Sequence, residues 1–319
     1  MGMFQWYMKE GKGVEKDEPQ KRGFFRFMDI FFRKFWRFLR LNLIYVLLSI
    51  PTFLVVFLLS GLISGNLLSG GVQNLMAEVL GLPAPDMANP EFAQMMLWFD
   101  LLIRLVISIL FMALWGMGPV TAGFTYVLRN FSREEHAWVW SDFWEHTRKN
   151  FKQAIALWFI DIVVFVLMSV AIFFYGSQGG YFFVLMYLMI MLLIIYTIMH
   201  FYLYPMMVTF QLSMKNLFRN ALIFALGKIP SNLLVLVLLL AIHVGLLYTV
   251  LMYLGSFLGI GVFVLAVFYL LILHSLSGFI INFAVYPKLK RYMIVEESVQ
   301  VKPEATGEEG TRAEENEED

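Results

Sequence analysis

Residues 181–204 read YFFVLMYLMIMLLIIYTIMHFYLY and contain no acidic residue, lysine or arginine. A helix of about 20 apolar residues crosses the roughly 30 Å hydrocarbon core of a bilayer. Because lipid offers no partner to backbone N–H and C=O groups, such a segment must be helical. Five further segments meet the same test: Leu43–Ile63, Leu101–Val127, Ala154–Tyr175, Leu233–Leu254 and Ile260–Tyr286. The sequence therefore predicts an all-α, polytopic transmembrane helical bundle with six spans.

Composition supports this prediction. Of the 319 residues, 60% are hydrophobic and 15% are charged, whereas a soluble domain is about half apolar and a quarter charged. The chain contains no cysteine, which excludes disulfides, thiolate metal ligands and cysteine nucleophiles.

Lysine and arginine are concentrated in alternate connections between the spans. The basic pieces are residues 21–40, 128–153, 213–232 and the segment after the last span, whereas residues 64–97, 176–180 and 255–259 hold neither residue type. Cytoplasmic loops carry the excess of these cations in membrane proteins. We therefore expect a multi-pass protein of the cell membrane with both termini in the cytoplasm.

The regions flanking the spans predict the domain organisation. We expect a flexible N-terminus at 1–20, an amphipathic helix at 21–40, a membrane domain at 41–289 and a disordered tail at 290–319. The segment 21–40 interleaves cations with Phe and Trp, so it is either a helix on the anionic inner leaflet or the basic anchor of the first span. Residues 296–319 carry ten acids against Lys302 and Arg312, a composition typical of disorder.

The ends of the second and fourth spans resemble each other. Counted from Pro119 and Pro205, the basic residues and the asparagines after them match without a gap, and they form the pairs Arg129-Asn130 and Lys215-Asn216. Proline removes one helical hydrogen bond and kinks a helix. We expect each helix to continue past its proline and carry the basic-Asn pair into the cytosol. The candidate hinge or docking residues are Gly118, Pro119, Arg129, Asn130, Pro205, Lys215 and Asn216.

Ionisable residues within spans are candidates for function, because a charge in the bilayer is expensive. The candidates are Asp161, His200, His243, His274 and Arg104. Asp100 lies four residues before Arg104 and can pair with it on one helix face. Asp161 and the histidines fit either a proton or cation path or packing residues that bond to neighbouring helices. No two of them have the i, i+4 spacing of metal ligands on one helix.

The connection 128–153 reads LRNFSREEHAWVWSDFWEHTRKNFKQ and contains Trp138, Trp140 and Trp144. Ser132 with Glu135, and Asp142 with Glu145, have the spacing of capping boxes. They predict two short helices that expose tryptophans, which suit either the membrane interface or a protein partner.

Enzyme signatures are missing from the sequence. It contains no G-x-x-x-x-G-K-[ST] phosphate loop, no H-E-x-x-H and no G-x-S-x-G. The cations lie where membrane topology requires them, which gives no indication of nucleic-acid binding. We therefore expect a protein that is not an enzyme, with no cofactor, no metal and no nucleic-acid partner, and with the lipid bilayer as its surroundings.

Four pieces of the sequence resemble motifs of a known family: Leu41-Asn42, Ser49-Ile50-Pro51, the run GPVTAGFTYVLR from Gly118 to Arg129, and SDFWEHTRKNFKQA after it. The family that they resemble is that of the YesL-like integral membrane proteins of bacteria. The resemblance covers roughly Phe24 to Leu289. Members of that family have no defined function but are often encoded beside carbohydrate ABC importers. The resemblance therefore implies an accessory component of such a system, with ABC transporter subunits as partners.

Three hypotheses for function follow. The first is a non-enzymatic accessory protein that binds a partner through 128–153 and 213–231. The second is a small proton- or ion-coupled transporter or channel that uses Asp161 and the intramembrane histidines. The third is a membrane sensor or regulator that responds through the long outer loop.

Overall fold

The computed structural model describes residues 23–68, 78, 90–254, 263–264 and 266–294, and every regular element in these ranges is a helix. In chain order the elements are α1 (Gly23–Arg33), α2 (Phe35–Leu59), α3 (Gly61–Leu67), α5 (Pro90–Leu114), α6 (Pro119–Ser132), α7 (Val139–Lys149), α8 (Phe151–Gln178), α9 (Phe182–Met207), α10 (Met214–Gly227), α11 (Ile229–Leu254), the π-helix η2 (Tyr269–Leu273) and α13 (His274–Met293).

Six helical segments are long and apolar enough to cross a membrane. They are Phe35–Leu67, Phe92–Leu114, Phe151–Gln178, Phe182–Met207, Ile229–Thr249 and Ala266–Met293. The prediction of an all-α, six-span membrane protein is therefore confirmed. The expected segment 1–20, the acidic tail after Ile294, the loop 255–259 and most of the loop 64–97 lie outside the described residues.

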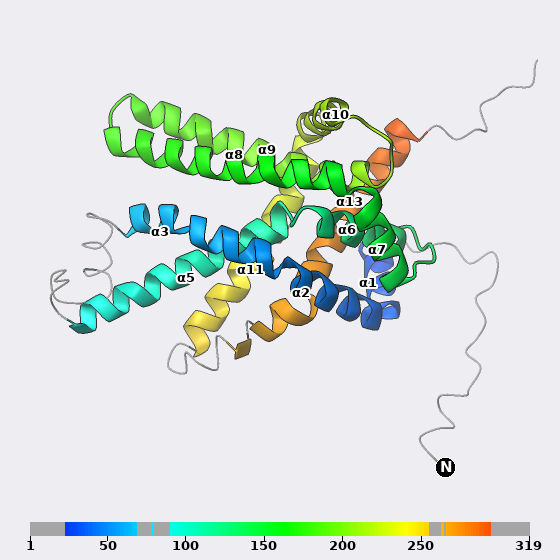
Figure 1. Ribbon diagram of the computed structural model, residues 1–319, viewed down its shortest axis with the longest axis horizontal. Coiled ribbons are helices and arrows are strands. Elements are labelled where there is room, and N and C mark those ends of the chain that lie inside the picture. Colours follow the sequence, from blue (N-terminus) through cyan, green and yellow to red (C-terminus); the bar gives the residue numbers. More distant parts are fainter. Residues whose placement is uncertain (1–22, 69–77, 79–89, 255–262, 265, 295–319) are drawn as a thin grey trace, which may run out of the picture.

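The helices α8 and α9 form a long antiparallel hairpin, and the short helices α1, α6 and α7 gather at one end of the molecule (Figure 1). α1, α6 and α7 lie together at that end, away from α3, the start of α5 and the turn between α8 and α9. α6 lies at the centre of the packing, because it contacts α2, α7, α8, α9 and α13. The cavity beside His200 and the surface of α7, described below, both adjoin α6 or the helix packed on it.

The basic segment 21–40 is divided between two helices. α1 ends at Arg33, and the residues from Phe35 onward belong to the first spanning helix, so the expected single helix over 21–40 is wrong. α1 packs on the bundle through Phe27, whose ring stacks on Phe279 at 4.7 Å. It exposes three phenylalanines on its other side: Phe24, Phe25 and Phe32.

α1 is also held by an ion pair to the end of α6. Arg26 and Arg33 both contact the carboxylate of Glu134. The backbone of Glu134 has a positive φ of 62°. Burial alone would raise the pKa of Glu134, but the hydrogen bonds from Arg33 and Arg26 outweigh that effect and hold this pKa below its ordinary value. The carboxylate is therefore charged at neutral pH and keeps α1 against α6.

The second span is interrupted where a kink was expected. α5 ends at Leu114, and Pro119 is the first residue of a separate helix, α6. Gly116 and Gly118 between them have φ of 89° and 66°, a region that favours glycine. Two glycines of this kind, one residue apart, let the chain leave the helix, and proline is well suited to begin the next one. The expectation that this helix continues past Pro119 is therefore wrong.

The fourth span also stops instead of continuing. Pro205 lies in the last turn of α9, and Lys215 and Asn216 belong to the separate helix α10, which is capped by Ser213. Lys215 and Asn216 are exposed, whereas Arg129 and Asn130 on α6 are buried. The two basic-Asn pairs match in sequence spacing but occupy different environments. The similarity therefore does not correspond to two equivalent helix extensions.

Asn42 links the first spanning helix to the last one. Its amide Nδ2 donates to the carbonyls of Tyr269 at 2.8 Å and Leu270 at 2.7 Å, both in η2. Its Oδ1 accepts from the N–H of Ser275 at 2.8 Å. A π-helix disturbs the regular pattern of backbone bonds. Asn42 supplies the partners that this local irregularity lacks.

We expect Asn42→Leu to destabilise the fold. The change leaves two carbonyls of η2 without this donor, and each buried polar group left unsatisfied costs about 1–3 kcal/mol. Thermal unfolding in detergent measures the effect. Ser169→Ala is a matched control, because the Ser169 hydroxyl donates only to the Phe165 carbonyl of its own helix. Equal melting temperatures for the two variants would contradict this role of Asn42.

Candidate functional site

A buried polar cluster joins α8 to α9. Asp161 Oδ1 lies 2.9 Å from His200 Nε2 and accepts a hydrogen bond of 2.7 Å from the Tyr196 hydroxyl. The side chains of Asp161 and His200 are both fully buried. An acid in such a place is stable only if it is paired and hydrogen-bonded. The structure therefore brings together two of the sequence-predicted candidates.

Aromatic rings surround this cluster. Trp115 stacks on the His200 ring with a centroid distance of 5.7 Å and donates through Nε1 to the Thr197 hydroxyl at 3.0 Å. Trp115 is the first residue after α5, so the interruption of the second span brings this indole over the imidazole. The rings exclude water from one side of the Asp161–His200 pair.

A small cavity adjoins His200. Its volume is about 40 Å³, and it is lined by residues of α2, α5, α6, α9 and α13 and by Trp115. Among these are Tyr45, Thr121, His200, Tyr204, His274 and Asn282. Four buried atoms of the lining have no hydrogen-bond partner within the described part of the chain: His200 Nδ1, Tyr204 Oη, His274 Nδ1 and Asn282 Oδ1. A cavity of this size and polarity has room for water but not for an organic substrate.

His243 lies near this region without joining the cluster. Its Nδ1 donates to the Leu239 carbonyl of its own helix at 2.9 Å. The ring of Tyr269 lies between the two histidines, 5.7 Å from His243 and 5.8 Å from His274. In the ranges that the structure describes, no three His, Asp or Glu side chains are placed to hold a metal ion.

The expected pairing of Asp100 with Arg104 is confirmed. Arg104 Nε lies 2.7 Å from Asp100 Oδ2, and Ser64 of α3 donates to the same carboxylate. Gly61 of α3 leaves the space that the guanidinium occupies, because a Cβ there would be 2.6 Å from Arg104 Nη1. This pair joins α3 to α5 at the opposite end from α7 and does not contact the Asp161 cluster.

Arg129 has a structural role inside the bundle. Its guanidinium donates to the Val208 carbonyl at 3.0 Å, to the Thr209 hydroxyl at 3.1 Å and to Asn130 Oδ1 at 2.9 Å. These bonds satisfy backbone groups where α9 ends. Because Arg129 is buried, it cannot serve as the exposed docking residue that the sequence suggested.

Only one helix, α7, lies wholly within the connection 128–153, where two short helices were expected. Ser132 is the last residue of α6, and its hydroxyl donates to the Arg129 carbonyl, so it does not cap a following helix. Asp142 lies in the first turn of α7 and accepts from the Trp138 N–H at 2.9 Å. The carboxylate is suited to this place because it satisfies an N-terminal N–H that the helix leaves free.

The inner face of α7 is packed tightly against α6. Phe143 is fully buried, and the His146 ring stacks on Tyr126. Burial lowers the pKa of His146 below its ordinary value, so the ring is neutral at pH 7. A Cβ added at Gly123 would collide with the Phe143 carbonyl, so the two helix backbones are in direct contact there.

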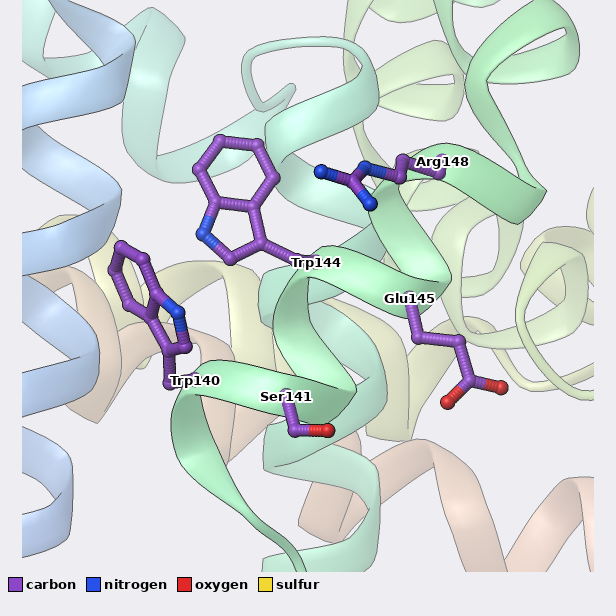
Figure 2. A pocket seen from close by; sticks show the side chains of 5 residues that line it. All are labelled: Trp140, Ser141, Trp144, Glu145 and Arg148. Carbon is purple, nitrogen blue, oxygen red and sulfur yellow. The ribbon is translucent and has the colours of Figure 1, made fainter.

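The outer face of α7 carries the tryptophans. Trp138 and Trp140 are 69% and 63% exposed. An open hollow of about 690 Å³ on this face is lined by Trp140, Ser141, Trp144, Glu145 and Arg148 (Figure 2). The two indoles of the hollow meet edge to face at 5.8 Å, and the Arg148 guanidinium lies 6.0 Å from the Trp144 ring. We call this the tryptophan hollow.

Several residues of these sites were missing from the sequence-based candidates. Tyr196 has no polar signal that distinguishes it from other aromatic residues of the span. Asn282 and Thr121 are polar residues in apolar surroundings, which is the signal that could have identified them. Tyr45 becomes recognisable only through its contact with Thr121, a hydroxyl pair at 3.3 Å.

Comparison with known protein families gives a match over part of this chain. The fold defines a multi-pass helical membrane protein, and residues 96–172 match the family described as "Protein of unknown function, DUF624". The matched region runs from α5 through α6 and α7 into α8 and includes Asp161. No curated protein and no solved structure matches the chain.

We expect His200→Leu to destabilise the protein strongly. The substitution leaves the buried Asp161 carboxylate with Tyr196 as its remaining partner, and breaking a buried pair in this way costs about 3–5 kcal/mol. His243→Leu is the control, because His243 donates only to a carbonyl of its own helix. Thermal unfolding of both variants in the same detergent measures the difference. If the two variants melt together, Asp161 does not depend on His200.

Proposed function

We propose that this protein is an accessory component of a bacterial carbohydrate ABC importer that binds its partner subunits through the tryptophan hollow. In this proposal it lies in the cell membrane with both termini in the cytoplasm, and it acts without catalysing a reaction. The single observation that carries the proposal is the hollow of about 690 Å³ on α7. The sequence resemblance to proteins encoded beside such importers supports the choice of partner.

The chemistry of the hollow suits a protein partner. Its lining combines two indoles with one acid, Glu145, and one cation, Arg148. Tryptophan and arginine are the residues most enriched where protein interfaces hold most of their binding energy. A surface that served only as a membrane anchor would need neither an acid nor a concave shape. The basic connections of the chain favour a cytoplasmic position for α7.

The rigidity of α7 also supports docking. Its inner face is fixed on α6, so the tryptophans are held in place before a partner binds. Preorganised side chains lose less conformational entropy on binding than mobile ones do. Because Arg129 is buried, we assign the contact to α7 and not to the basic-Asn pair.

The test is purification of tagged protein from its native membrane in mild detergent. We expect an ABC permease or its ATPase to copurify in near-stoichiometric amount, identified by mass spectrometry. Trp140→Ala with Trp144→Ala should reduce recovery by about tenfold or more, since truncating such an anchor costs about 2 kcal/mol or more. Trp98→Ala is the control, because Trp98 is 58% exposed but lies on α5. Recovery of the wild-type protein alone would contradict the proposal.

A second candidate function is a small proton- or ion-coupled transporter. The observation that favours it is the buried Asp161–His200 pair beside a polar cavity. Ionisable residues held inside a membrane bundle are typical of proton and ion pathways. His200 and His274 both line that cavity, so water in it would connect the imidazole of His200, which is paired with Asp161, to the imidazole of His274.

This candidate predicts pH-dependent flux in liposomes that contain the purified protein. Asp161→Asn should abolish the flux, because it removes the group that exchanges a proton with His200. Asp100→Asn serves as the control, since Asp100 is the other acid that lies within a span and is paired to Arg104. An absence of flux in the wild-type protein would exclude this function.

A further inference from the structure

The carboxyl-terminal half of the membrane domain carries cations without acids. Between Asp161 and Glu296 the sequence contains no aspartate or glutamate. It contains six cationic residues there: Lys215, Arg219, Lys228, Lys288, Lys290 and Arg291. Three of these come together at the junction of α10, α11 and α13, beside the rings of Tyr292 and Tyr202.

Two of the three cations adjoin the ring of Tyr292, near the end of α13. Lys228 Nζ lies 5.1 Å from its centroid and Arg291 Cζ lies 5.5 Å from it. Lys288 donates to Asn232 Oδ1 at 2.9 Å and to the Tyr202 hydroxyl at 3.1 Å, and both partners are neutral. Within the described residues, Lys228, Lys288 and Arg291 form no ion pair. We call these three residues the cationic junction.

An apolar surface adjoins the cationic junction. Lys228 directly follows α10, whose outward side exposes aliphatic residues. Leu222, Ile223, Leu226 and the neighbouring Ile229 are 40–56% exposed. α11 begins and α13 ends at this level, so the cations lie at the edge of two spanning helices. Clustered cations at that depth meet the phosphates of the bilayer, and aliphatic side chains next to them meet its acyl chains.

We propose that the cationic junction is a binding site for an anionic phospholipid. Lys228, Lys288 and Arg291 contact the phosphate, and an acyl chain lies along the exposed aliphatic side of α10. A soluble phosphate would satisfy the charges but would leave the aliphatic residues uncovered. A neutral phospholipid would cover the aliphatic residues but would leave three clustered cations without a counter-charge. This site is separate from the tryptophan hollow and from the Asp161 cluster.

The test uses the full-length protein in phosphatidylcholine nanodiscs, with phosphatidylglycerol added at increasing mole fraction. Thermal unfolding follows the stabilisation, and native mass spectrometry counts retained lipids. We expect phosphatidylglycerol to raise the melting temperature in a saturable way. The double variant K228Q/R291Q should need about ten times more phosphatidylglycerol for half of the effect, whereas K228R/R291K should behave as the wild-type protein does.

The matched control is K149Q/K152Q, which removes two exposed cations at the end of α7 and the start of α8. We expect this variant to respond as the wild-type protein does. Three outcomes would overturn the proposal. One is an equal loss in both glutamine variants, which would mean general attraction to a charged bilayer. Another is the same stabilisation by inorganic phosphate in place of phosphatidylglycerol. The third is an absent lipid effect with carbodiimide crosslinks from Lys228 to the acidic residues after 295, which would assign the junction to the chain's own tail.

Discussion

Hydrocarbon contains nothing that can bond a free backbone N–H or C=O group, and this constraint determines how the bundle is held together. Several interruptions of the helices are matched by a polar side chain from another element. Asn42 satisfies η2, and Thr121 accepts the Met117 N–H where α5 stops. Arg129 satisfies the end of α9, and Asn232 donates to the Phe224 and Ala225 carbonyls near the end of α10. The bonds of Asn42 and Arg129 therefore also join distant parts of the chain.

This constraint explains why the spans could be predicted from the sequence and their interruptions could not. The number of spans follows from composition, because only long apolar helices are stable in lipid. Proline by itself predicts a kink at both Pro119 and Pro205. At Pro119, however, two preceding glycines with positive φ end one helix, and a new helix begins at the proline. Arg129 and Lys215 lie at the same distance from their prolines, but this spacing does not indicate that Arg129 is buried and Lys215 exposed. Whether such a residue lies inside depends on the helices around it, and α6 is surrounded whereas the start of α10 is not.

In the candidate sites, too, the residues could be identified from the sequence but their arrangement could not. Asp161 and His200 could be identified because ionisable residues are rare in spans. Their pairing could not be predicted, since it depends on the register between α8 and α9. The three tryptophans of the connection 128–153 were recognisable as a group, and two of them line the hollow. Its concave shape required the single helix α7, which the spacing of Ser132 and Asp142 did not indicate.

Together α6 and α7 separate the interior cavity from the tryptophan hollow. Thr121 and Thr125 lie on the cavity side of α6, while Gly123 and Tyr126 support α7. The hollow lies on the outer face of α7, so the partition is two packed helices thick. The backbones of α6 and α7 touch at Gly123, and closely packed helices leave little room for one to move without the other. The two indole rings of the hollow are therefore mechanically connected, through one glycine contact, to the helix that lines the cavity.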